Sequence, residues 1–155
     1  MIYAISDLHG DYEKYAAMLK KIQFSEADTL YVLGDVIDMG ADGLRILMDM
    51  SARSNVFPII GEHEFRALPL LRRLKGSLSE KMAANFAADT MRAFAEWGKQ
   101  GGQETVRAFR AMPKDDRAWI LEYLEEFVPY EEVTAGGREF VLVHAGLENF
   151  SAERP

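Results

Sequence analysis

The sequence predicts an α/β fold: a parallel sheet built from βαβ units, followed by a helical insertion and a β-hairpin. Three observations lead to this prediction. Short apolar segments of strand type alternate with amphipathic helical patterns from Ile2 to Ile60, and helical patterns alone occupy residues 65–126. Two β-prone segments around a glycine turn then follow. Alternating strands and helices are typical of right-handed βαβ units with parallel strands.

The first part of the chain contains three predicted strands and two predicted helices. The strands are short, apolar segments of high β-propensity: Ile2–Ser6, Asp28–Leu33 and Asn55–Ile60. Asp11 can cap a helix over Tyr12–Ile22. Asp42 can cap a second helix, whose apolar face carries Leu44, Ile46, Leu47 and Met50.

The helical stretch between Glu64 and Phe127 divides into three further predicted helices. Ser79 can cap the first of them, which carries Met82, Phe86, Met91, Phe94 and Trp97 and which Gly101-Gly102 would end. The second spans Gln103–Met112, and the third begins at Pro113 with an apolar face of Trp119, Ile120, Tyr123 and Leu124. We expect this insertion, about residues 65–126, to pack on the core; a substrate-facing cap is the alternative.

A β-hairpin is predicted after the helical stretch. The segments Phe127–Thr134 and Arg138–His144 flank Ala135-Gly136-Gly137, and the two glycines suit a tight turn. We found no internal repeat and no low-complexity segment in the sequence. We therefore expect residues 1–155 to form a single domain.

Composition favours a globular cytoplasmic protein. Of the 155 residues, 48% are hydrophobic and 28% are charged, which suits one core of ordinary size. No apolar run approaches the roughly 20 residues of a membrane span, and we expect neither a membrane segment nor a secretory signal. The net charge of −7 argues against nucleic acid as the main partner. The absence of cysteine excludes thiolate metal sites.

Acidic and histidine side chains follow the predicted strands. Four strand ends carry, in order, Asp7 with His9, Asp35 with Asp38, Glu62 with His63, and His144. The chain has three histidines, and all of them lie just past a predicted strand and close to a glycine. In open α/β sheets ligands bind beyond the carboxyl ends of the strands. We therefore expect these side chains to form one site.

Each motif alone has an ordinary structural explanation. Asp7 and His9 could be a turn acid and a surface histidine, and the two aspartates after Gly34 could belong to a helix-capping turn. His63 could lie in a solvated charge cluster, and His144 could be a satisfied histidine at a strand end. Four independent coincidences at matching strand ends are a poorer explanation than one metal centre.

Mixed carboxylate and imidazole ligands favour Mn²⁺, Fe or Zn²⁺ over Ca²⁺. Two such ions about 3.5–4 Å apart can neutralise both oxygens of an in-line displacement at phosphorus. One carboxylate has to bridge the two ions. Asp35 is the predicted bridge, since it follows directly on a buried strand, where an unpaired carboxylate would be costly.

The motifs resemble the signature of the calcineurin-like metallophosphoesterases, and within them the bacterial phosphoprotein phosphatases of the lambda phosphatase type. That signature reads Asp-x-His-Gly, Gly-Asp-x-x-Asp-Arg-Gly, Gly-Asn-His-Glu and a later His-Ala-Gly or His-Gly-Gly. This chain has, in the same order, Asp7-Leu-His-Gly, Gly34-Asp-Val-Ile-Asp-Met-Gly, Gly61-Glu-His-Glu and His144-Ala-Gly. The stretch from Trp97 to Thr105 also looks like one that is common in bacterial members.

The resemblance implies a set of metal ligands and a fold. Asp7 and His9 would bind the first of two divalent ions, Asp35 would bridge the pair, and Glu62 and His144 would bind the second. Manganese is the ion we expect, with iron or zinc as alternatives. The implied fold is the metallophosphatase βαβ sandwich, with four layers in the order α/β/β/α in the family.

The resemblance also implies a reaction. A hydroxide that bridges the two ions would attack phosphorus directly, with no phosphoenzyme. His63 would be the general acid that protonates the leaving alkoxide, and Asp38 would orient it. The expected activity is hydrolysis of a phosphomonoester, with a protein phosphorylated at serine or threonine, or a small phosphoester, as substrate. A nucleotide hydrolase related to diadenosine tetraphosphatases and a non-catalytic metal-binding module are the alternatives.

Three departures from the signature bear on these alternatives. Met39 stands where the family has an arginine that clamps phosphate, and Glu62 replaces an asparagine ligand. The family also has a further histidine ligand in a Gly-His-x-Pro segment after His144, and no histidine follows His144 here. We therefore expect the chain to lack the C-terminal part of the family domain and to belong to a longer protein.

Overall fold

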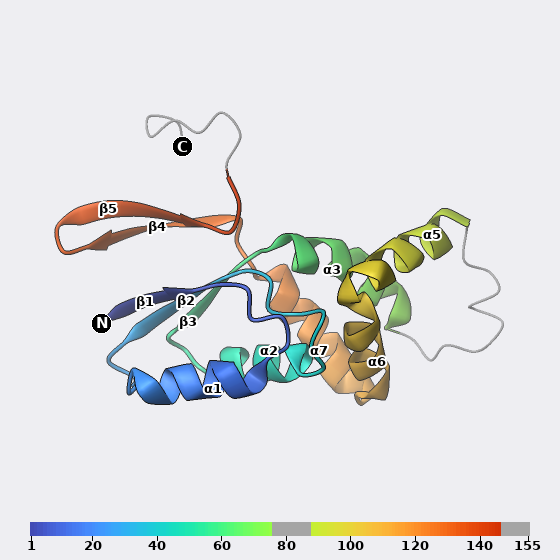
Figure 1. Ribbon diagram of the computed structural model, residues 1–155, viewed down its shortest axis with the longest axis horizontal. Helices are drawn as coiled ribbons and strands as arrows, with labels where there is room; N and C mark the ends of the chain where they lie inside the picture. Colours follow the sequence, from blue (N-terminus) through green and yellow to red (C-terminus); the bar gives the residue numbers. More distant parts are fainter. Residues whose placement is uncertain (76–87, 147–155) are drawn as a thin grey trace.

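A parallel sheet of three strands organises the N-terminal part of the protein. The computed structural model describes residues 1–75 and 88–146. The strands lie in the order β1 (Ile2–Ile5), β2 (Thr29–Leu33) and β3 (Val56–Ile59), and both pairings are parallel. Figure 1 shows helices α1 (Tyr12–Lys21) and α2 (Gly43–Ser51) below this sheet. The predicted α/β class and the predicted βαβ order are confirmed.

The first two helices begin where the sequence indicates. The Asp11 side chain accepts a hydrogen bond from the Lys14 backbone N–H at 3.0 Å, which is the predicted cap of α1. Asp42 occupies the corresponding position before α2, but its side chain makes no capping hydrogen bond. Asp42 contributes instead through its backbone N–H, which donates to the carbonyl of Gly10 and ties the two loops together.

The helical stretch contains α3 (Glu62–Leu74), α5 (Ala88–Trp97), α6 (Gln103–Ala111) and α7 (Lys114–Glu125). Helix α3 begins two residues before the predicted helical patterns, so Glu62 and His63 lie in its first turn. A kinked segment, η1 (Gly98–Gly102), joins α5 to α6; Gln100 and Gly101 within it have non-helical backbone angles, and Gly101 has a φ of +91°. Of the helix predicted from Ser79, the part that carries Met82 and Phe86 lies outside the described residues.

The hairpin consists of β4 (Tyr130–Ala135) and β5 (Arg138–Val143), which pair antiparallel. Gly136 and Gly137 both have positive φ, the conformation that a two-residue turn of this kind requires. The Ile60 backbone N–H donates to the Val128 carbonyl at 2.9 Å, so the chain enters the hairpin beside the end of β3. This connection brings the end of β5, and with it His144, back to the sheet.

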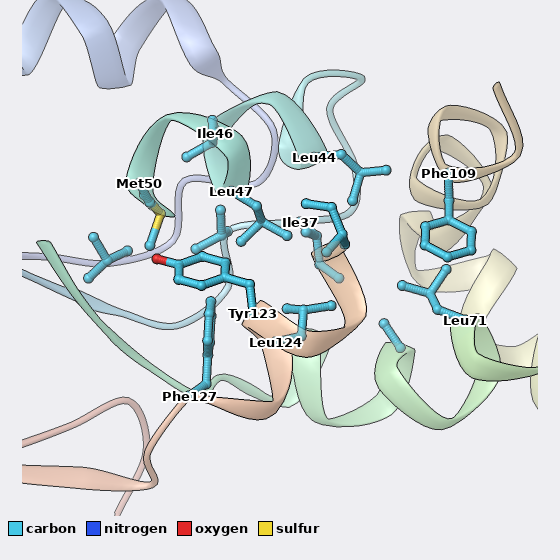
Figure 2. Packing of buried hydrophobic residues seen from close by; sticks show 14 of the residues in the cluster. Ile37, Leu44, Ile46, Leu47, Met50, Leu71, Phe109, Tyr123, Leu124 and Phe127 are labelled. Atoms are coloured by element: carbon cyan, nitrogen blue, oxygen red, sulfur yellow. The ribbon is translucent and has the colours of Figure 1, made fainter. Parts of the chain in front are cut away.

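One hydrophobic cluster joins the sheet, its two covering helices and the helical stretch. Figure 2 shows Tyr123 and Leu124 of α7 beside Leu47 and Met50 of α2. Phe109 of α6 belongs to the same cluster and is fully buried. The helical stretch therefore packs into the main core. No described helix is long and apolar enough to cross a membrane.

Candidate metal centre

The loops that follow β1 and β2 are tied together by backbone hydrogen bonds. The His9 N–H donates to the Asp35 carbonyl at 2.9 Å, and the Gly10 N–H donates to the Val36 carbonyl at 2.8 Å. The Gly40 N–H donates back to the His9 carbonyl at 2.9 Å. These bonds hold the Asp7–His9 segment against the Asp35–Gly40 segment, so the two predicted motifs share one site.

Several residues of the site have left-handed backbone conformations. The φ angles are +58° for Asp7, +41° for His9, +55° for Asp35 and +69° for Asp38. Such conformations are uncommon for residues other than glycine, and each costs free energy that the surrounding contacts must supply. These residues cluster in the two loops, so tertiary contacts hold the loop backbone in a conformation that the residues would not adopt by local preference.

Two glycines allow the strand ends to approach each other closely. A Cβ atom on Gly34 would lie 2.5 Å from the backbone of Gly61, and one on Gly61 would lie 2.2 Å from Oδ1 of Asp35. Neither position has room for a side chain. The glycine before Asp35 and the glycine before Glu62 are therefore required by the contact between the ends of β2 and β3.

Three imidazoles converge on one carboxylate oxygen, Oδ2 of Asp35. The Nε2 atoms of His144, His9 and His63 lie 3.3, 3.9 and 4.0 Å from it. Each ring is held through its other nitrogen: His9 Nδ1 lies 3.3 Å from the Ile37 carbonyl, His144 Nδ1 lies 2.6 Å from the Leu33 carbonyl, and His63 Nδ1 lies 2.7 Å from Asp38. Anchoring Nδ1–H in this way turns Nε2 towards Asp35, where it can bind a metal or transfer a proton.

The side chains form two overlapping groups that could each hold a metal ion. One contains Asp7, Asp35 and His144, and the other contains His9, Asp35 and His63; within each group the ligand atoms lie within 4.8 Å of one another. Asp35 belongs to both, which fits the predicted bridge. Its carboxylate is buried, whereas Asp7 is exposed. Mixed carboxylate and imidazole donors of this kind suit Mn²⁺, Fe or Zn²⁺.

The grouping differs in detail from the predicted ligand pairs. Asp7 Oδ1 lies 3.9 Å from His9 Nε2, so the pair that the resemblance implies is close together, and Asp7 also belongs to the group with His144. Glu62 Oε2 lies 3.0 Å from His144 Nε2, beside the first group, and the Glu62 side chain is 59% exposed. The structure therefore brings all five predicted ligands to one place, and their binding of metal remains a prediction.

Asp38 is fully buried and receives hydrogen bonds from two helices besides His63. The Trp97 indole N–H donates to Oδ2 at 2.6 Å, and the Thr105 hydroxyl donates to Oδ1 at 2.6 Å. The Asp38 backbone N–H donates in turn to the Thr105 oxygen at 3.0 Å. Sequence reasoning did not assign these roles to Trp97 and Thr105. The available signal was a tryptophan among the apolar residues of a predicted helix, because the N–H of a buried indole needs an acceptor.

Replacing Thr105 by valine is expected to weaken this network. Valine keeps the shape but leaves the Asp38 carboxylate and N–H short of partners in a buried place, which costs roughly 1–3 kcal/mol of stability. We expect the free energy of unfolding, measured by chemical denaturation, to fall by that amount. Thr105→Ser is the matched control, since it retains the hydroxyl. Equal stability of the valine variant and the wild type would show that Asp38 needs no support from α6.

Glu64 is a third residue whose role sequence reasoning missed. Its buried carboxylate accepts hydrogen bonds from four backbone N–H groups, those of Asp35, Val36, Ile37 and Gly61. Burial raises the pKa of Glu64, and the backbone donors partly offset that rise. Glu64 therefore ties the start of α3 to the loop after β2 and fixes the backbone on both sides of Asp35.

Met39 lies at the surface beside η1. Its side chain is 57% exposed, and its backbone N–H donates to the Gly101 carbonyl at 3.2 Å. A Cβ atom on Gly101 would lie 2.6 Å from that same nitrogen, so the two backbones are in close contact. Methionine offers no hydrogen-bond donor at this position, as expected from the sequence.

Comparison with known proteins points to one family. The sequence profile of the calcineurin-like phosphoesterases matches residues 1–154. The chain is 33% identical over 148 residues to a symmetrical bis(5'-nucleosyl)-tetraphosphatase of Cellvibrio japonicus (strain Ueda107), covering 94% of this chain and 44% of that protein. It is 31% identical over 98 residues to the protein of the same name from Wigglesworthia glossinidia brevipalpis, covering 61% and 36%.

A third relative, a symmetrical bis(5'-nucleosyl)-tetraphosphatase of Acidovorax sp. (strain JS42), is 26% identical over 155 residues, covering 98% of this chain and 46% of the relative. The chain thus spans between a third and a half of the length of these relatives. The family uses a pair of metal ions, which the two groups sharing Asp35 can accommodate. The chain belongs to the calcineurin-like phosphoesterase family.

Proposed function

We propose that this protein is a metal-dependent hydrolase of nucleoside polyphosphates, acting on a dinucleoside tetraphosphate. The observation that carries the hydrolase part is the convergence of three anchored imidazoles on Asp35. Two divalent ions bound there, manganese in our proposal, would supply Lewis acidity at phosphorus and acidify a water molecule. Asp7, His9, Asp35, Glu62 and His144 are the residues that we assign to holding them.

His63 is the proposed general acid. Its Nδ1–H donates to Asp38, so Nε2 faces the centre and can carry a proton to the leaving oxygen. Asp38 is in turn held by Trp97 and Thr105, which keeps the imidazole from rotating.

The substrate is inferred from the relatives. Those described above are named as symmetrical bis(5'-nucleosyl)-tetraphosphatases, which supports the nucleotide alternative over the phosphoprotein substrate that the signature suggested. The absence of a donor at Met39 is consistent with a substrate bound differently from a phosphoprotein. A phosphopeptide therefore serves as the substrate with which the dinucleoside tetraphosphate is compared.

The test measures turnover of three substrates by the purified protein with Mn²⁺: diadenosine tetraphosphate, a phosphoserine peptide and p-nitrophenyl phosphate. We expect the tetraphosphate to give the highest kcat/KM by at least tenfold. Faster cleavage of the phosphopeptide would restore the protein phosphatase reading. If the wild type turns over none of the three substrates and His63→Asn behaves in the same way, the protein is a non-catalytic metal-binding module.

Metal binding is expected to weaken as the pH falls. Burial lowers the pKa of His144, but the Leu33 carbonyl and the carboxylates of Asp35 and Glu62 outweigh it, so the pKa lies above its usual value. A metal needs the unprotonated Nε2, so below that pKa the ion must displace a proton. We expect the Mn²⁺ affinity to fall about tenfold per pH unit there, measured by electron paramagnetic resonance.

His144→Gln is the control for this experiment. It removes the titrating ring, so the affinity should be lower throughout and should depend less steeply on pH. A wild-type affinity that is equal at about pH 8 and about pH 6 would contradict a role for His144 as a ligand.

A further inference from the structure

The metal centre is rich in negative charge. The carboxylates of Asp7, Asp35 and Glu62 surround it, and the exposed Glu62 lies at its rim. Ions bound there would offset these carboxylates and the charge of the phosphate at the centre. A polyphosphate chain carries further negative charges that lie beyond the reach of the two ions. A positive group just outside the ligand set would attract those phosphates.

Arg66 of α3 is the candidate for such a group. It follows His63 by three residues and Glu62 by four on α3, so all three side chains share one face of the helix. One helical turn rises about 5.4 Å, and an arginine side chain can extend over that distance. Arg66 is partly buried, so its position is defined by its neighbours.

The contact made by Arg66 connects α3 to η1. Its guanidinium donates to the side-chain oxygen of Gln100 in η1. The next residue, Gly101, accepts the backbone hydrogen bond from Met39 in the loop after β2. Arg66 therefore bridges α3 and η1 at the point where η1 touches the loop that carries Asp35 and Asp38.

The charge of Arg66 is not neutralised by a carboxylate within the described residues. Two other arginines of the described part show the contrast, since Arg53 pairs with Asp49 and Arg72 with Glu125. The partner of Arg66 is the neutral amide of Gln100. A guanidinium has five N–H donors in a planar fork that fits phosphate oxygens, so most of its donors stay available for an anion.

We propose that Arg66 binds the part of the substrate's phosphate chain that lies outside the metal centre and thereby favours polyphosphates over monoesters. This inference rests on the proposed function, since it concerns the substrate of the same site. Gln100 positions the guanidinium before substrate binds. Met39, next to this contact, lacks a donor and leaves the task to Arg66.

The test compares wild type with Arg66→Met and Arg66→Lys on diadenosine tetraphosphate and on p-nitrophenyl phosphate, with Mn²⁺ in excess. Methionine should raise KM for the tetraphosphate roughly tenfold to a hundredfold, the range of a lost charge-assisted hydrogen bond. The kcat/KM for p-nitrophenyl phosphate should stay within about twofold, because a monoester has no further phosphate. Lysine should recover part of the loss, as it keeps the charge but not the fork.

Arg73→Met is the matched control, since it makes the same change on the exposed part of the same helix. It should leave both substrates unaffected. Equal losses on both substrates in Arg66→Met, or no loss on either, would overturn the inference. Calorimetric binding of adenosine tetraphosphate with Mn²⁺ separates the two proposals. If wild type binds it at least tenfold more tightly than Arg66→Met but hydrolyses nothing, the hydrolase proposal fails and the role of Arg66 stands.

Discussion

Replacing Asp35 by asparagine is expected to abolish the response of the protein to metal and to lower hydrolysis by a factor of a thousand or more. Asp35 belongs to both candidate metal groups, so the substitution removes one anionic ligand from each ion at once. Metal ions contribute several kcal/mol of transition-state stabilisation, and about 1.4 kcal/mol corresponds to a factor of ten in rate. No other single change in the chain should have a larger effect.

Thermal unfolding provides a readout of this change that does not depend on turnover. A ligand that binds only the folded state stabilises it by about 2.7 kcal/mol at a hundred times its dissociation constant. Wild type should gain that stability with Mn²⁺, and Asp35→Asn should not. Without metal the variant should be at least as stable as wild type, because a buried carboxylate near Glu64 has been neutralised.

Asp115→Asn is the control for Asp35→Asn. Asp115 is exposed on α7, so the same change of charge there should alter neither metal binding nor turnover. If Asp35→Asn keeps the full stabilisation by Mn²⁺, the assignment of Asp35 as the shared ligand is wrong.

The second large effect is expected at the pair of His63 and Asp38. His63→Asn removes the proposed proton donor, and general acid catalysis is typically worth about 10²–10⁴ in rate. Asp38→Asn should cost a similar factor in kcat, because the ring then loses its charged acceptor. Two residues that act as one unit are not additive, so the double variant should be no slower than the worse single variant.

Metal-induced stabilisation separates the proton-transfer role of His63 from a ligand role. His63 lies in the group with His9 and Asp35, and its Nε2 is near enough to Oδ2 of Asp35 to serve as a ligand. An acid catalyst can be removed without loss of the Mn²⁺ effect on thermal unfolding, whereas a ligand cannot. Loss of that effect in His63→Asn would make His63 a ligand and require another acid.

The strand ends and their motifs could be predicted from the sequence because they depend on local information. Short apolar segments such as Ile2–Ser6 have a local pattern and composition typical of strands, and parallel strands bring their carboxyl ends to one edge. Asp7, Asp35, Glu62 and His144 could therefore be assigned to one site before any coordinates were known. The glycine turn of the hairpin was readable for the same reason, since its φ angles demand it.

Contacts between distant helices could not be read in this way. Asp38 meets Trp97 and Thr105 across 59 and 67 residues of sequence, and no periodicity encodes such a pairing. The helical patterns indicate an apolar face, but they do not indicate which polar group that face will meet. The position of α5 and α6 follows from packing around Phe109 in the shared core.

The sequence by itself determined the set of side chains at the centre, because each follows a strand whose direction is set by the βαβ order. Tertiary structure alone decided the contacts around them: Asp7 near both His9 and His144, Glu64 on four backbone N–H groups, and Arg66 against Gln100. These contacts depend on how each helix or strand is rotated about its axis and how closely it packs on its neighbours. Packing in one common core, rather than local preference, sets that rotation and that distance.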